Sequence, residues 1–209
     1  MYVPPLYKNE DQQAIRSFID QNGFANLVSL VNGKLWATHL PLMFSKDQTT
    51  LYGHFSRANE QWRNIADNDE VLAIFNGPHA YISSSWYNHE NVPTWNYIAV
   101  HVYGKARIIT GDELVASLAD LTDKYEKHST NPVSVSRMTP AYVEKEIRGL
   151  VGFAMQVDRI KAANKLSQNR DKVNHEQIIA QLQKRNEGSD IAVAEAMKAY
   201  PPSKFKSHE

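Results

Sequence analysis

Ser56, Arg57 and Asn59 form the first set of residues whose types suggest chemistry. They stand in the segment FSRAN, between an expected short strand and an expected helix. A hydroxyl, a forked guanidinium and the N–H groups of a helix start suit a phosphate dianion. A helix cap made by Ser or Asn beside a surface arginine fits the same spacing. Both interpretations stay open at this point.

The second set lies between Glu70 and Gly104, where two expected strands, Val71–Phe75 and Tyr97–Tyr103, are joined by a connection rich in rings and hydroxyls. Asn76-Gly77-Pro78 is expected to end the first strand in a turn. Flat rings beside hydroxyls suit a planar heteroaromatic ligand, and they equally suit a barrel core or a dimer contact. The connection contains Tyr81, Ser83, Ser84, Ser85, Trp86, Tyr87, Trp95 and Asn96.

A third polar cluster, KLSQNR, follows an expected strand, Leu150–Val157, and is placed to complete a ligand site through Lys165, Gln168 and Asn169. The histidines offer a different chemistry, because histidine is a common metal and haem ligand. Their spacing fixes no pair, so haem handling stays an alternative and no metal site is expected. The candidate haem ligands are His39, His54, His79, His89 and His101.

The elements that position these sets read mainly as strands. The clearest signal is a hairpin in which Asn32-Gly33 joins Phe24–Val31 to a second arm, 34–44, since Asn-Gly readily adopts the positive φ angles of a two-residue turn. Pro41 cannot donate to a strand ladder, so that arm is expected to end or bulge there and to expose His39. The spacing near the C-terminus predicts two helices, 174–186 and 190–200.

Composition narrows the class of protein. The 209 residues carry 23 basic and 23 acidic side chains, so no global field attracts the protein to polyanions or membranes. There is no cysteine, which excludes disulfides and thiolate catalysis. No apolar run approaches the roughly 20 residues of a membrane span. We expect a cytoplasmic protein with no membrane partner, made of one domain and a helical tail.

The two tail helices have the spacing of a helix-turn-helix. The second reads DIAVAEAMKAY, with one lysine and no Arg, Asn or Gln to read base edges in the major groove. DNA is therefore a possible partner for which the sequence offers no base-reading element. A packed helical hairpin is the better interpretation.

Four segments taken in order carry a family resemblance: HLPL at 39–42, GHFSRAN at 53–59, GPHAYISSSWY at 77–87 with VPTWNYIAVHVYG at 92–104, and KLSQNR at 165–170. Together they resemble the PaiB family of FMN-binding negative transcriptional regulators, over nearly the whole chain. The resemblance implies a mainly β fold with helices, a six-stranded, mostly antiparallel split β-barrel. It also implies a homodimer with FMN at the interface. We expect the split barrel at residues 1–170 and a C-terminal helical hairpin, packed on it, at 171–209.

The resemblance also implies roles for individual residues. Ser56 and Arg57 match the pair that grips the flavin phosphate in pyridoxamine phosphate oxidases. Ala58 stands where those oxidases carry a lysine, a loss for which Asn59 or Lys165 would compensate. Trp95 and Asn96 belong to the block that approaches from the partner chain. The full set of expected cofactor contacts is Thr38, His39, Leu40, His54, Ser56, Arg57, Ala58, Asn59, Ser83, Ser85, Trp95, Asn96, Lys165, Gln168 and Asn169.

Two functions follow from this reading. The first is an FMN-binding repressor of transcription. The second is a flavin-dependent oxidoreductase or flavin reductase, which the neutral charge and the tail favour. No residue is needed as a covalent nucleophile or general base, because hydride chemistry belongs to the flavin, and no catalytic residue is assigned.

Overall fold

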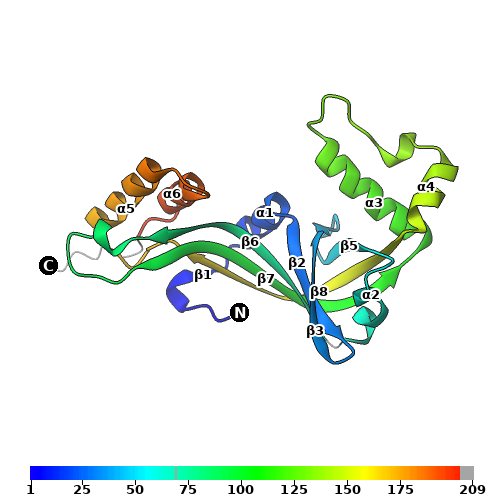
Figure 1. Ribbon diagram of the computed structural model, residues 1–209, viewed down its shortest axis with the longest axis horizontal. Coiled ribbons are helices and arrows are strands. Elements are labelled where there is room, and N and C mark those ends of the chain that lie inside the picture. The colour runs from blue at the N-terminus through cyan, green and yellow to red at the C-terminus, as the bar shows by residue number, and fades with distance from the viewer. Residues whose placement is uncertain (69, 203–209) are drawn as a thin grey trace. The chain divides into compact units, whose positions relative to one another are not determined.

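The computed structural model describes residues 1–68 and 70–202 (Figure 1). Residues 203–209 of the predicted C-terminal extension lie outside this part. The strands are β1 (Lys8–Asn9), β2 (Phe24–Val31), β3 (Lys34–Pro41), β4 (Met43–Phe44), β5 (Thr50–Ser56), β6 (Val71–Ile82), β7 (Thr94–Ile109) and β8 (Leu150–Lys165). The α-helices are α1 (Gln12–Gln21), α2 (Gln61–Asn64), α3 (Gly111–Glu126), α4 (Pro140–Ile147), α5 (Lys172–Arg185) and α6 (Asp190–Ala199).

The strands form one sheet in the order β3-β2-β6-β7-β8-β5-β4, with β1 paired to β8. Antiparallel pairing joins β2 to β3 and β6, β5 to β4 and β8, and β1 to β8. The order does not close on itself, since β3 and β4 lie at its two ends. Six of the strands have seven residues or more, and β1 and β4 have two each. The mainly β, antiparallel fold is thus confirmed, with two short strands added to the six expected.

The chain divides into two compact units, and each is described here by itself. Unit 1 contains Met1–Phe18, Asn76–Val100 and the chain from Lys161 onward. Unit 2 contains Ile19–Phe75 and His101–Ile160. The predicted domain boundary between residues 170 and 171 falls within unit 1 and stays a prediction.

Unit 2 has the alternating burial of half-buried strands. The two-residue loop of the β2–β3 hairpin has positive φ at both positions, 50° at Asn32 and 75° at Gly33, which confirms the expected turn. On β5, Leu51 and Phe55 point into the core, where Phe55 packs on Phe153 with ring centroids 4.8 Å apart. The opposite face of β5 carries Thr50, Tyr52, His54 and Ser56.

Unit 1 contains the predicted helical hairpin. Helices α5 and α6 pack against each other and against the end of β6, as Figure 1 shows. The core here is made by Ala80, Ile82, Tyr87, Leu166, Ile178, Leu182, Val193, Ala194 and Met197. Helix α5 begins at Asp171, whose carboxylate accepts from the backbone N–H of Asn174, and ends at Asn186 in the left-handed conformation.

Two sequence expectations about strand ends are wrong. Asn76-Gly77-Pro78 does not form a turn, because β6 continues through it to Ile82. Gly77 is used instead for close packing, since a Cβ there would lie 2.5 Å from the ring of Phe18. Strand β8 likewise continues past Val157 and reaches Lys165.

Candidate cofactor site

The predicted phosphate-binding residues lie at the end of β5 in unit 2. The Arg57 guanidinium is held in place by the start of β8, because its Nε donates to the Arg148 carbonyl (2.6 Å) and its Nη2 to the Leu150 carbonyl (2.8 Å). Its backbone N–H donates to the Gly149 carbonyl. The third guanidinium nitrogen, Nη1, meets no acceptor among the described residues. One end of the guanidinium is therefore fixed and the other is available.

Three donor groups belong to consecutive residues at this end of β5. The Ser56 side chain is exposed, and its only recorded contact is a long one, 3.4 Å, from the backbone N–H of Ala58. The Ser56 hydroxyl, the Ala58 N–H and Arg57 Nη1 are the kinds of donors that hold a phosphate group. Ala58 has no side-chain charge to offer, but its backbone N–H remains useful.

The helix after this segment differs from the expected one. Helix α2 is a single turn, and its first N–H, that of Gln61, donates to Asn59 Oδ1 at 3.0 Å. A helix this short has a small dipole, so phosphate binding here would depend on side chains and on the Ala58 backbone N–H. Asn59 does not stand free either, because its Nδ2 donates to Thr38 Oγ1 at 2.8 Å.

Gln61, which sequence reasoning missed, organises the neighbouring strands. Thr38 donates to its Oε1 at 2.6 Å, and its Nε2 donates to the Leu27 carbonyl (3.1 Å) and to Ser29 Oγ (2.9 Å). Gln61 is fully buried, so these bonds replace water. The network fixes Thr38 and Asn59 relative to β2. No local sequence pattern predicts this network, because Thr38 and Leu27 lie more than 20 residues from Gln61 in sequence.

The remaining predicted contacts in unit 2 have distinct environments. Leu40 is buried, whereas His39 is exposed, as expected for the residue before Leu40-Pro41, and lies near the Phe24 ring. His54 is half-buried on the Ser56 face of β5, and burial lowers the pKa of its imidazole. Its neutral form is thereby favoured.

Unit 1 carries the aromatic part of the predicted set. Trp95 is half exposed on β7, with its ring 6.0 Å from that of Tyr81 and 6.1 Å from that of His79. Ser83 Oγ accepts from the Ser85 N–H at 3.2 Å, and the two hydroxyls lie 2.8 Å apart. These side chains form an accessible ring-and-hydroxyl surface of the kind a planar ligand needs.

Other predicted contacts in unit 1 are used inside the protein. Asn96 is fully buried, donates to Met197 Sδ and accepts from the Ser167 hydroxyl. Gln168 accepts from the Leu166 N–H and donates to the Asn164 carbonyl, which closes the turn after β8. Asn169 is exposed in the same turn. Burial and internal hydrogen bonds give Asn96 and Gln168 a clear structural role.

Lys165, the last residue of β8, is half-buried and donates to Thr94 Oγ1 at 2.5 Å. Burial, and secondly the nearby Arg170 guanidinium, lower the pKa of the Lys165 ammonium. The sequence grouped Lys165 with Gln168 and Asn169, but its surroundings are different, because it lies beside a second cation.

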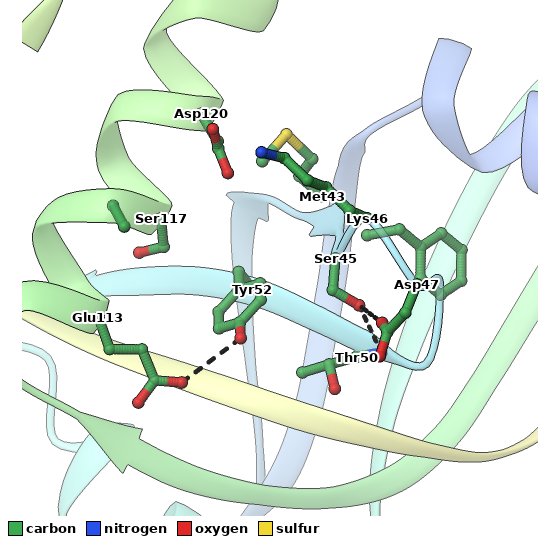
Figure 2. A pocket seen from close by; sticks show the side chains of 11 residues that line it. Met43, Ser45, Lys46, Asp47, Thr50, Tyr52, Glu113, Ser117 and Asp120 are labelled. Carbon is green, nitrogen blue, oxygen red and sulfur yellow. Dashed lines mark hydrogen bonds between the residues drawn. The ribbon is translucent and has the colours of Figure 1, made fainter.

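A separate cavity of about 390 Å³ in unit 2 contains none of the predicted residues (Figure 2). It lies between β4, the following loop, β5 and α3, and Tyr52 points across it to Glu113, with 3.4 Å between the hydroxyl and the carboxylate. Asp47 is held by Ser45 and Thr49. Two of its three carboxylates, Asp47 and Glu113, have partners, and none of the residues predicted to contact the cofactor lines it.

The histidines do not support a metal centre. Within residues 1–68 and 70–202, no group of three or more His, Cys, Asp or Glu side chains is arranged to hold an ion. His39, His54 and His101 belong to unit 2, and His79 and His89 to unit 1. Nδ1 of His79 donates to the Gly77 carbonyl, and His89 contacts Asn88. In the same part of the chain, no helix has the length and apolar character of a membrane span.

The antiparallel sheet, which does not close on itself, and its peripheral helices form a split-barrel-like fold. It is similar to the FAD and heme binding protein from Mycobacterium smegmatis (TM-score 0.63, 16% identity, 83% of this chain and 80% of that chain). It is also similar to the flavocytochrome Anf3 from Azotobacter vinelandii (TM-score 0.60, 17% identity, 81% and 75% covered). At these identities the likeness concerns the fold.

The sequence gives the closer assignment. Residues 1–159 match the family described as "Putative FMN-binding domain". The protease synthase and sporulation protein PAI 2 of Bacillus subtilis (strain 168) is 46% identical over 199 residues, which cover 94% of this chain and 96% of that protein. The chain therefore belongs to the PaiB family and carries an FMN-binding domain, as its motifs indicated.

Proposed function

We propose that the protein is a negative transcriptional regulator of the PaiB type that holds FMN at the interface of a homodimer. The observation that carries the proposal is the group of available donors at the end of β5. Ser56 Oγ, Ala58 N and Arg57 Nη1 fit a phosphate dianion, and the fixed half of the guanidinium would keep the binding geometry in place. Bound there, FMN would supply the redox chemistry.

The exposed rings of unit 1 support the second half of the proposal. A flavin ring system needs a flat apolar wall, and Trp95 offers one on a surface that stays accessible in a single chain. In the proposed dimer the partner's Trp95 would cover the ring system while Ser56 and Arg57 hold the phosphate. Thr38, His39, Leu40, His54 and Asn59 would lie near the ring and ribityl chain. Ser83, Ser85, Asn96, Lys165, Gln168 and Asn169 stay predicted contacts.

The regulatory role draws support from the family and from the name of the Bacillus subtilis relative, which refers to protease synthesis and sporulation. The direct test is an absorption spectrum of freshly purified protein, followed by binding to promoter DNA at several salt concentrations. We expect a flavin absorption spectrum, and we expect the protein to retain promoter DNA in a sequence-specific and salt-dependent manner. A colourless protein with no affinity for added FMN would contradict the cofactor claim for this chain.

A flavin-dependent oxidoreductase is the second candidate. The observation that favours it is the state of α6, whose Val193, Ala194 and Met197 are fully buried in the core of unit 1, while its exposed face offers Glu195 and Lys198 paired with each other. Such a helix has nothing to read bases with. Oxidation of NADH or NADPH with bound FMN and an acceptor, faster than with free FMN, would favour this function.

We expect Arg57→Ala to weaken FMN binding by about 1.5–3 kcal/mol, because it removes a charge-assisted contact to the phosphate. Titration with FMN and with riboflavin measures this, since riboflavin lacks the phosphate and should lose far less. The apo protein should also lose about 1 kcal/mol of stability through the carbonyls of Arg148 and Leu150.

The matched control is Arg63→Ala. Arg63 is exposed on α2, and its recorded contact is with the Trp62 ring, 5.7 Å from the centroid. Its removal should leave both ligands unaffected. An equal loss of FMN and riboflavin affinity in Arg57→Ala would show that Arg57 acts only on the fold.

A further inference from the structure

The feature that the FMN proposal does not explain is a cluster of two cations and three phenols in unit 1, made of Tyr7, Tyr87, Tyr97, Lys165 and Arg170. We call it the Lys165–Arg170 cluster. The Arg170 guanidinium carbon lies 4.9 Å from the centre of the Tyr87 ring. Pairing of Lys8 with Ala163 brings Tyr7 beside the end of β8. Four separate segments of the chain thus meet here.

The two cations stand on either side of the turn that follows β8, where the Arg170 N–H donates to the Ser167 carbonyl at 3.1 Å, and they lack acidic partners. Burial first and Arg170 second lower the pKa of Lys165, so the two charges interact. Neither forms an ion pair with a carboxylate of the described residues. The adjacent Asp171 is engaged as the cap of α5, with bonds to Asn174 N and Nδ2, and Glu176 lies near Lys172. Two half-buried like charges without a counter-charge are costly.

Polar atoms in the cluster are also left without partners. Tyr87 is more than nine-tenths buried, yet its hydroxyl has no hydrogen-bond partner among residues 1–68 and 70–202, and neither does the buried Nε of Arg170. Tyr7 lies close enough that Arg170, Tyr97 and Tyr87 all affect its pKa, which burial raises above the ordinary value. Buried donors normally find acceptors, so these atoms indicate a missing acceptor.

We propose that the Lys165–Arg170 cluster is a binding site for the oxyanion group, carboxylate or phosphate, of a small organic molecule. An oxyanion would neutralise Lys165 and Arg170 and accept from Arg170 Nε and the Tyr87 hydroxyl. The phenol rings would border the organic part of the ligand. On this proposal Lys165, one of the predicted FMN contacts, serves a second anion instead, while Ser56 and Arg57 serve the FMN phosphate. The site does not depend on FMN being bound.

The experiment measures binding of orthophosphate, acetate and benzoate to the full-length protein by calorimetry, with and without saturating FMN, at constant ionic strength. We expect the wild type to bind at least one of these anions, equally with and without FMN. Arg170→Gln and Lys165→Gln should each weaken that binding about tenfold or more, the scale of one charge-assisted bond. Preference for phosphate or for the carboxylates identifies the source of the oxyanion.

Lys161→Gln is the matched control, because Lys161 lies exposed on the same strand and donates only to the Met1 carbonyl. Thermal unfolding distinguishes a ligand-binding role of Lys165 from a structural role. Without anion, Lys165→Gln should melt at or above the wild-type temperature, since it relieves repulsion, and it should lose the rise in melting temperature that the anion gives the wild type.

Three results would overturn the proposal. One is a wild type that binds none of the probes more tightly than a double variant that carries both Lys165→Gln and Arg170→Gln. Another is a variant that melts well below the wild type without anion, as a structural residue would. The third is that FMN competes with the anion and that Arg170→Gln loses affinity for FMN but not for riboflavin. That result would assign the cluster to the cofactor phosphate. If the protein does not bind FMN, anion binding can still be measured in the apo protein, so the two proposals can fail separately.

Discussion

Replacing Gly104 with alanine is expected to destabilise the protein by about 3 kcal/mol or more, because the new Cβ would lie 1.9 Å from the Gln156 carbonyl oxygen. The obstacle is backbone of the neighbouring strand β8, which cannot rotate away as a side chain can. Strand β8 also supplies the Leu150 carbonyl that fixes Arg57, so the damage should reach the candidate phosphate site. Denaturant unfolding followed by circular dichroism measures the loss.

Gly149→Ala is the control for this prediction. A Cβ at Gly149 would lie 3.4 Å from the Glu146 carbonyl, an ordinary contact, and the backbone angle there is accessible to alanine. Its unfolding free energy should stay within about 0.5 kcal/mol of the wild type. A loss of less than about 1 kcal/mol in Gly104→Ala would mean that β7 and β8 can separate at this point without cost.

The second large effect is expected at Asp190, whose carboxylate is buried. Arg185 grips it in a bidentate pair, with Nε to Oδ2 at 2.6 Å and Nη2 to Oδ1 at 2.5 Å, and the Glu187 N–H adds a third bond. The same guanidinium donates to the Tyr81 carbonyl and lies over the Trp86 ring. Asp190→Ala leaves this charge without its partner and should cost about 3 kcal/mol.

Glu195→Ala, which breaks the exposed pair with Lys198 on the same helix, should cost less than about 1 kcal/mol. Equal losses in the two variants would show that burial adds nothing to the Asp190 pair. Thermal melting of both proteins at one pH makes the comparison. Reduced packing of α6 on β6 in Asp190→Ala should also appear as a change in Trp86 fluorescence.

The Asp190 pair also predicts how stability depends on pH. The hydrogen bonds from Arg185 are the largest cause that lowers the pKa of Asp190 in the folded protein. The hydrogen bond from the Glu187 N–H and the Arg185 charge lower that pKa further. Its contribution is therefore complete above the unfolded carboxyl pKa of about 3.9 and is lost as the pH falls from there through the lowered folded value. The stability difference between the wild type and Asp190→Asn should shrink over that acidic range.

The sequence was informative where local rules decide the structure. Asn32-Gly33 supplied the positive φ angles of a two-residue hairpin, and the C-terminal periodicity located α5 and α6 within a few residues. The family motifs predicted the FMN-binding domain and the mainly antiparallel fold, which were confirmed. Local preference and tertiary packing agree at these positions.

The sequence was least informative where distant parts of the chain decide the structure. Asn76-Gly77-Pro78 has the composition of a turn, but packing of Phe18 against Gly77 explains the glycine in a continuous strand. Asn96 and Gln168 have ligand-like amides, yet Met197, Ser167 and Leu166 already occupy them. No pattern of neighbouring residues reveals the pairing of Asn96 with Met197 and Ser167, and the same holds for the role of Gln61, whereas the bonds of Gln168 are local to its turn. Their contacts with FMN stay predictions.

The chain passes between its two compact units four times, after Phe18, Phe75, Val100 and Ile160, and three of these passages lie inside β6, β7 and β8. No continuous piece of the gene encodes either unit. Recombination could not graft one of them onto another protein, and a truncated transcript would leave both incomplete. The two units are therefore encoded and inherited together.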